Sequence, residues 1–220
     1  MILFQDDHLI ALRMALDTVA TFREMRTVLA GIHLDFPQGR MVATDGTRLF
    51  MAGLPLADTD PEAPPTVLVV RNPVTRAQVR KLPLGWRVAA LDLEAGTLRG
   101  SGRGSDTTGE FRVEVVQEVY PTTDRIVRPF LEAAGVPSLE AARLVFNPDL
   151  LKAWSFGQEP CLDIELMLTG TYPALLVTCA HLTIPHLGLV MGMSYQPRDP
   201  RKVVGPLIPG YPMPTQAEVN

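Results

Sequence analysis

One local pattern occurs three times along this chain of 220 residues: a short apolar segment, a residue suited to capping a helix, and an amphipathic segment with helical spacing. These three strand-helix pairs occupy residues 1–20, 66–82 and 142–154. Asn72-Pro73 and Asn147-Pro148 place an N-cap residue before a proline at the first helical position, which favours a helix start. Three strand-like segments follow each expected helix. The sequence therefore predicts a unit of strand, helix and three strands, repeated at roughly 65 to 75 residues.

The repeated unit also predicts the domain organisation. One helix covers only one small sheet, and two such halves normally pair to close a core. We expect a complete domain of two units at residues 1–129, a linker at 130–141, and a half domain at 142–195 whose unit has no partner within the chain. Residues 196–220 are rich in proline and glycine. They are expected to form a mobile tail, with a docking peptide as the alternative.

Composition is typical of an ordinary globular protein, with 46% hydrophobic and 20% charged residues. The net charge of −4 gives no overall argument for nucleic acid or membrane binding, although a local basic stripe is compatible with it. Cys161 and Cys179 lie in apolar alternating segments and are expected to be free thiols in a reducing compartment. The N-terminal segment lacks the basic flank of a signal peptide, and no apolar stretch is long enough to span a bilayer. We expect a cytoplasmic protein.

No arrangement of residues is typical of an active site. The stretch GSGRGSD leads into a strand rather than a helix, unlike a phosphate-binding loop. The 4 histidines show no metal-ligand spacing, and no nucleophile elbow is present. We therefore expect a protein that is not an enzyme and has no catalytic residue, metal or cofactor. An enzyme whose site is hidden by divergence of the fold is the weakest alternative.

The first expected helix has an apolar face and a mixed outer face. Asp6 or Asp7 is expected to cap it, and Arg13 shares its outer face with Asp6 and Asp17. The expected core face consists of Leu9, Leu12, Leu16 and Val19.

The second expected helix carries a basic stripe. Arg76 and Arg80 are four residues apart and lie opposite Val74 and Leu82. Such a stripe is usually a solvated face, and contact with DNA phosphates is the alternative. The basic residues on or beside the three helices that we assign to DNA contact are Arg13, Arg71, Arg76, Arg80, Lys81 and Lys152.

The stretch VATDGTRLF, residues 42–50, contains the hairpin-turn dipeptide Asp45-Gly46, so it could be only a turn. However, this stretch lies in a longer segment that resembles the middle domain of the bacterial DNA polymerase III beta sliding clamp. The segment reads TVLAGIHLDF…GRMVATDGTRLFMAGLPL. That family has a similar hydrophobic strand followed by A-T-D-G-x-R-L. Three later segments are similar to the family in the same order: YPTTDRIVRP (residues 120–129), LVFNPDLLKAW (residues 144–154) and LGLVMGMSY (residues 187–195).

The resemblance implies an α+β DNA-clamp fold of three strand-helix-three-strand units, with the helices on one face of antiparallel sheets. The chain resembles the middle domain plus the second half of the third domain of the family. It departs from the family at Met191-Gly192-Met193, which replaces Met-Pro-Met, and at Asp124, where the family often has a basic residue.

The resemblance also implies a peptide-binding pocket between the middle and third domains. In the family, this pocket holds the short apolar motif of polymerases, clamp loaders and repair proteins. The corresponding residues are Arg26, Leu29, Thr44, Thr47, Arg48, Leu49, Pro121, Ile126, Leu189, Met191 and Met193. Leucine, isoleucine and methionine would line an adaptable apolar groove, with Thr44, Arg26 and Arg48 as its polar rim. The Asp45-Gly46 turn is then structural, and the residues flanking it form the site.

On this basis we expect a sliding-clamp-like processivity factor of DNA replication. It would encircle duplex DNA as a homo-oligomer, without reading the sequence, and tether a DNA polymerase and clamp-loader-like proteins. The alternative is a clamp-like module that forms no ring and sequesters the same peptides. The expected assembly is a tetramer, a dimer of dimers in which residues 142–195 of two chains face each other about a two-fold axis. A closed or open dimer is the alternative assembly.

Overall fold

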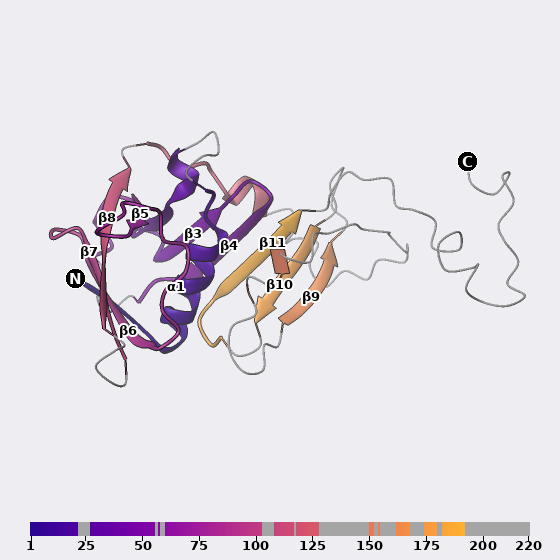
Figure 1. Ribbon diagram of the computed structural model, residues 1–220. Helices are drawn as coiled ribbons and strands as arrows, with labels where there is room; N and C mark the ends of the chain where they lie inside the picture. The colour runs from indigo at the N-terminus through magenta and orange to yellow at the C-terminus, as the bar shows by residue number, and fades with distance from the viewer. Residues whose placement is uncertain are drawn as a thin grey trace, which may run out of the picture.

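The computed structural model describes residues 1–21, 27–55, 57, 60–102, 108–116, 118–127, 150–151, 154, 162–167, 174–179 and 182–191. They form an α+β structure in which a long antiparallel sheet carries few helices (Figure 1). The first unit contains β1 (Ile2–Gln5), α1 (Asp6–Thr18), the 3-10 helix η1 (Thr27–Ala30), β2 (Ile32–Asp35), β3 (Arg40–Thr44) and β4 (Arg48–Gly53). The second contains β5 (Thr66–Arg71), β6 (Trp86–Asp92), β7 (Thr97–Gly102) and β8 (Gly109–Val116). The third contains β9 (Leu162–Met167), β10 (Ala174–Cys179) and β11 (His186–Met191).

The strands form one 11-stranded sheet in the order β1-β6-β7-β8-β5-β2-β3-β4-β11-β10-β9. Units one and two exchange strands reciprocally: β1 of the first pairs with β6 of the second, and β5 of the second pairs with β2 of the first. Each unit thus places its first strand beside the second strand of the other. This exchange joins the two units into one continuous sheet.

The third unit continues the same sheet. Its last strand, β11, pairs antiparallel with β4, and Leu189 lies opposite Leu49. Its Trp154 is fully buried beside Phe50, with ring centroids 6.3 Å apart, and its indole N–H donates to Thr18 Oγ1 at 2.9 Å. Unit three is thus joined to unit one along the edge of β4. The reciprocal exchange that pairs units one and two has no counterpart for unit three among the described strands.

Helix α1 covers one face of the sheet, and its expected core residues Leu9, Leu12, Leu16 and Val19 are all buried. The expected cap by Asp6 or Asp7 is wrong: Gln5 is the N-cap residue and makes no side-chain capping bond. The Asp7 carboxylate instead accepts hydrogen bonds from the hydroxyl and the N–H of Thr183 in the third unit, which lower the pKa of Asp7. None of the helices in the described ranges has the length and hydrophobicity needed to span a bilayer.

The expected second helix is absent: residues 72–82 form one turn followed by extended chain. Asn72 does start a turn, because its side-chain oxygen accepts from the N–H groups of Val74 and Thr75, both at 2.9 Å. Arg76 then adopts φ of 59°, which a right-handed helix cannot continue. Val79 N donates to Val70 O at 2.7 Å, so the chain returns along β5.

The tertiary surroundings explain why no helix forms there. The side-chain N–H groups of Gln78 donate to the carbonyl oxygens of Ala20 and Ala30, at 2.9 and 2.8 Å. A helix would remove Gln78 from these two acceptors, which lie beyond the end of α1. Weak helix propensity is overridden by such contacts. Val74, expected on the helix face opposite the basic stripe, is 85% exposed.

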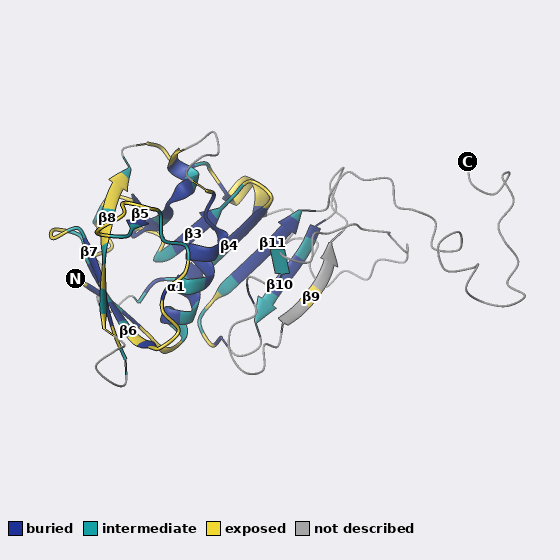
Figure 2. Ribbon diagram, viewed as in Figure 1, coloured by how far each residue is buried: buried dark blue, intermediate teal, exposed yellow. Residues whose placement is uncertain are grey.

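The two faces of the sheet have separate cores. Alternate residues of β4 divide between them: Phe50 and Ala52 pack on the α1 side, whereas Leu49 and Met51 pack on the opposite side. Figure 2 shows β4 and β11 as largely buried, in contrast to the exposed β8. The β4–β11 pair therefore lies in the interior of the sheet and has an apolar cluster on each face.

Candidate functional site

An apolar cluster covers the β4–β11 junction on the face opposite α1, and we call it the seam cluster. Its buried members are Val28, Val42, Leu49, Val67, Tyr120, Val127, Ala174, Leu176, Leu187 and Leu189. Partly buried Leu29, Met51, Val116 and Met191 pack against them. The register sets the central contacts, because Leu189 lies opposite both Leu49 of β4 and Leu176 of β10. The Met191 N–H extends this pairing by donating to Thr47 O at 2.9 Å.

Residues 118–127 cover one side of the seam cluster. The Tyr120 ring stacks on the His33 ring of β2, with centroids 4.7 Å apart and planes 11° apart. Burial raises the pKa of Tyr120, and a smaller effect of the Thr44 backbone opposes this rise. Arg40 fixes the same segment from β3, because its Nη1 and Nη2 donate to the two Asp124 oxygens at 2.6 and 3.2 Å. Asp124 thus anchors this covering segment.

The structure brings together four of the pocket residues predicted from the sequence: Leu29, Leu49, Leu189 and Met191. Pro121 and Ile126 lie on the covering segment, next in sequence to the cluster members Tyr120 and Val127, and Ile126 is 46% exposed. Predicted residues Arg26 and Met193 lie outside the described residues.

Arg48 does not belong to a polar rim of this cluster, so that expectation is wrong. Arg48 and Leu49 are adjacent on β4, and successive strand residues point to opposite faces. Arg48 is buried on the α1 side, where its Nε pairs with Asp45 at 2.9 Å and its Nη2 donates to the Asp17 carbonyl at 2.5 Å. Its Nη1 also donates to the Leu150 carbonyl at 3.3 Å. Arg48 therefore joins α1, the β3–β4 turn and the third unit.

Thr44 and Thr47 belong to the turn that precedes Arg48. The Thr44 hydroxyl donates to Arg48 O at 2.7 Å, and the Thr47 N–H and hydroxyl donate to Asp45 Oδ1 at 2.9 and 2.7 Å. Burial alone would raise the pKa of Asp45, but the hydrogen bonds from Thr47 and Arg48 outweigh it and lower that pKa. Gly46 supplies the positive φ of 89° that the turn requires. Thr47 is exposed next to Met191, whereas Thr44 is part of the turn itself.

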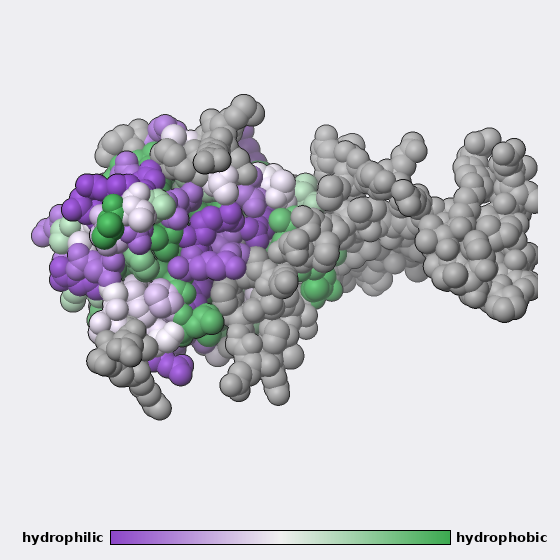
Figure 3. Space-filling model, in the orientation of Figure 1, coloured by the Kyte–Doolittle hydropathy of each residue, from purple (hydrophilic) through white to green (hydrophobic). Residues whose placement is uncertain are grey.

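The residues predicted to contact DNA do not form one stripe. Arg13 and Arg80 lie on the α1 side but bind backbone carbonyls: Arg13 Nη2 donates to those of Pro83, Leu84 and Trp86, and Arg80 Nη2 to that of Asp17. Burial lowers the pKa of Arg13. Lys81 keeps an exposed side chain near Asp17, and Lys152 lies outside the described residues. Figure 3 shows hydrophilic side chains over much of the region of α1, β5 and β8.

Arg71 and Arg76 lie away from α1. On β5, Val67 packs in the seam cluster, whereas Leu68 and Val70 face α1. By this alternation Arg71 lies on the same face of the sheet as Val67, where it pairs with Glu114 of β8. The expectation of a helical stripe through Arg76 and Arg80 is therefore wrong, because no helix carries them. Arg112 was not among the predicted residues, and the register places it opposite Arg71. The alternation of GEFRVEVV predicts a strand but not this pairing.

Within the described ranges, no group of three or more histidine, cysteine, aspartate or glutamate residues could hold a metal ion. The architecture, a long antiparallel sheet with few helices, is that of the DNA-clamp fold. No protein-family model and no curated protein matches the sequence.

Solved structures similar to this chain are bacterial sliding clamps. The DNA polymerase III beta chain from Streptococcus pneumoniae TIGR4 has a TM-score of 0.51 and 16% identity, covering 88% of this chain and 64% of that one. The beta subunit from Streptococcus pyogenes has a TM-score of 0.50 and 15% identity, covering 86% and 64%. The Helicobacter pylori beta clamp bound to a DNA ligase peptide has a TM-score of 0.50 and 12% identity, covering 88% and 65%. The chain thus has the fold of a sliding clamp and spans slightly less than two thirds of the length of these chains.

Proposed function

We propose that this protein is a sliding-clamp-like factor of DNA replication that tethers partner proteins through the seam cluster. The observation that carries the proposal is the convergence of Leu29, Leu49, Leu189 and Met191. These residues are distant in sequence and come from both sides of the β4–β11 junction. The similarity in fold to a clamp bound to a DNA ligase peptide supports the same assignment.

The chemistry of the seam cluster suits an apolar peptide. Leu49 and Leu189 form a buried floor, whereas Leu29 and Met191 are only partly buried at its edge. An unbranched methionine can adapt to different apolar side chains, which suits a site that binds several partners. Exposed Thr47 lies at this edge, because its carbonyl accepts from the Met191 N–H.

The peptide site can be tested by calorimetry with the DNA ligase peptide that the H. pylori clamp binds. Leu29→Ala and Met191→Ala remove edge side chains without opening the buried floor. A loss of about 2 kcal/mol, typical of an interface hot spot, would weaken binding by about 30-fold. Val74→Ala, at an exposed position outside the cluster, is the matched control. Unchanged affinity in both edge variants would refute the peptide site.

We further propose that the chain encircles duplex DNA as a homo-oligomer, a tetramer built from two dimers. Units one and two pair by strand exchange, in which the first strand of each unit lies antiparallel to the second strand of the other. The expected first strand of unit three, at residues 142–146, lies outside the described residues, so its second strand is β9. Among the described strands, β9 pairs only with β10. A second copy of residues 142–195 could complete that edge about a two-fold axis.

Native mass spectrometry tests this assembly. We expect a tetramer that dissociates through a dimer, and crosslinks between 142–195 segments of two chains. A trimer, or dimers whose crosslinks never join these segments, would exclude it. A closed or open dimer that crosslinks through these segments would keep the two-fold contact and exclude only the larger ring.

One observation favours a second candidate function, a module that forms no ring and sequesters clamp-binding peptides. A ring that slides on DNA needs cations directed to the phosphates from its helices. The second unit has no helix at residues 72–82, and Arg13 and Arg80 donate to internal carbonyls. A monomer at micromolar concentration that still binds the peptide would establish this second function.

A further inference from the structure

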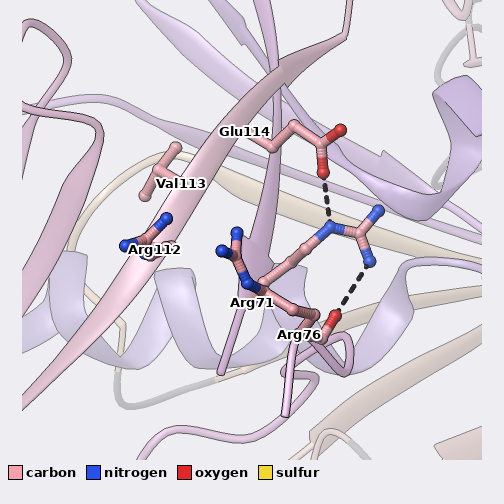
Figure 4. Close-up of a pocket in the computed structure, with 5 residues that line it drawn as sticks. All are labelled: Arg71, Arg76, Arg112, Val113 and Glu114. Carbon is pink, nitrogen blue, oxygen red and sulfur yellow. Dashed lines mark hydrogen bonds and ion pairs between the residues drawn. The ribbon is translucent and has the colours of Figure 1, made fainter. Parts of the chain in front are cut away.

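Three arginines gather in a pocket on the sheet face opposite α1 (Figure 4). The pocket has a volume of about 480 Å³ and is lined by Arg71, Arg76, Arg112, Val113 and Glu114. Figure 4 shows the guanidinium groups in front of the sheet, with a helix behind it. The pocket lies in the second unit and shares none of these residues with the seam cluster.

The local structure places each arginine. The β5–β8 register sets Arg71 directly opposite Arg112. Asn72 then closes a turn, because its N–H donates to Ala77 O at 2.8 Å and its carbonyl accepts from Arg76 N at 3.1 Å. This turn brings Arg76 back beside Arg71, whose Nη1 donates to Arg76 O at 3.3 Å.

The three guanidinium groups differ in their bonding. Arg71 is fixed, since its side chain is only 16% exposed and pairs with the Glu114 carboxylate. Arg76 and Arg112 are exposed. Within the described part of the chain, neither of their guanidinium groups has a hydrogen bond or ion pair. Two cationic groups therefore remain available around a third that is held in place.

Backbone strain at Arg76 is a second observation at the same place. Its φ of 59° lies in the left-handed region, which glycine and asparagine adopt more readily than arginine. Strained residues of this kind are concentrated at functional sites. An arginine at this position directs a cation to the pocket at a cost in backbone conformation that glycine would avoid.

We propose that this pocket binds the phosphate group of a phosphate-bearing ligand. A guanidinium matches phosphate oxygens through two parallel N–H donors, and Arg76 and Arg112 offer two such forks. Glu114 repels an anion, but Arg71 neutralises it. The pocket is thus a local positive site in a chain whose net charge is −4. The phosphate comes either from a small ligand such as pyrophosphate or from a nucleic-acid backbone, and because the pocket lies away from α1, the assignment does not depend on the proposed ring.

Titration calorimetry at low salt tests the proposal with two probes, inorganic pyrophosphate and a single-stranded oligonucleotide. Arg76→Gln and Arg112→Gln are each expected to weaken binding by about tenfold, the effect of losing one charge-assisted hydrogen bond. Arg99→Gln is the matched control, because Arg99 lies on β7, pairs with Glu110 and does not line the pocket. Unchanged circular dichroism and thermal unfolding establish that each variant is folded.

The outcomes separate the two sources of phosphate. Arginine-dependent binding of pyrophosphate assigns a small-ligand site. Binding of the oligonucleotide alone, with a salt dependence that falls by about one unit of slope in Arg112→Gln, assigns a nucleic-acid backbone. An equal loss in Arg99→Gln would show general charge attraction and overturn the proposal. So would the absence of binding to either probe in the unmodified protein.

Discussion

At the scale of single residues, Arg48 shows how one side chain connects three parts of the chain. Its side chain is 5% exposed, and its guanidinium contacts Asp45, Asp17 and the Leu150 carbonyl. Removing one partner of a buried ion pair leaves the other charge without compensation. We therefore expect Arg48→Met to lower the free energy of unfolding by about 3 kcal/mol in urea denaturation. The matched variant Arg99→Met breaks an exposed pair with Glu110 and should cost no more than about 1 kcal/mol. Equal losses would contradict the structural role of Arg48.

His33 gives a residue-scale prediction about pH. Burial lowers the pKa of His33 below its ordinary 6.5; the Asp35 charge opposes this, and Arg40 adds to it. The unfolded chain therefore binds the proton more readily, so stability falls as the pH drops below about 6.5. His33→Phe keeps a ring to stack on Tyr120 but cannot titrate. Between pH 8 and pH 5, urea denaturation should show a smaller loss of stability in His33→Phe than in the unmodified protein. Parallel pH profiles would contradict this assignment.

At the scale of elements, the sequence predicted what local patterns determine. The strand-like segments that became β2, β3 and β4 and the leucine spacing of α1 were predicted correctly, because apolar periodicity is a local property of the sequence. The second helix was not, because Asn72-Pro73 starts a turn and the carbonyls of Ala20 and Ala30, distant in sequence, determine the path of the chain after that turn. In the candidate site, Leu49 and Leu189 were predicted from the family resemblance, and their apolar side chains agree with burial in the seam cluster. The orientation of Arg48 depends on strand register and on Asp17, and the basic pocket depends on the β5–β8 pairing, which no local pattern contains.

The fit between β11 and the third unit's helical segment gives an element-scale prediction. A Cβ at Gly188 would lie 2.6 Å from the Trp154 ring, closer than atoms of a side chain can approach. Gly188→Ala should displace Trp154 from Phe50 and Thr18 and cost about 1 to 3 kcal/mol. The measurement is thermal unfolding, with a red shift of Trp154 fluorescence as a second readout. Gly53→Ala is the control, because its added Cβ would meet only ordinary contacts at 3.8 Å. Equal stability of the two variants would contradict the packing described.

At the scale of the whole molecule, one apolar core joins all three units on the α1 side. Trp86 of the second unit and Trp154 of the third both belong to it, and they are the protein's 2 tryptophans. We expect cooperative unfolding, in which Trp154 fluorescence in a Trp86→Phe variant and circular dichroism give the same urea midpoint. The reciprocal Trp154→Phe variant reports from Trp86 and should behave likewise. A separate, earlier transition of Trp154 would show that the third unit unfolds independently.

The β4–β11 junction has a consequence for the order in which the chain acquires its structure. β4 pairs with β3 at once but meets β11, its second partner strand, only after about 140 further residues have been made, and such non-local pairing slows folding. Until then a nascent chain can already build β1 through β8, while one edge of β4 stays open with Leu49 and Phe50 at its two faces. An open apolar edge of this kind is a template for aggregation. During synthesis, β11 therefore acts as the cover of an otherwise self-associating intermediate, and a ribosome that stalls before residue 186 would release a chain prone to aggregate.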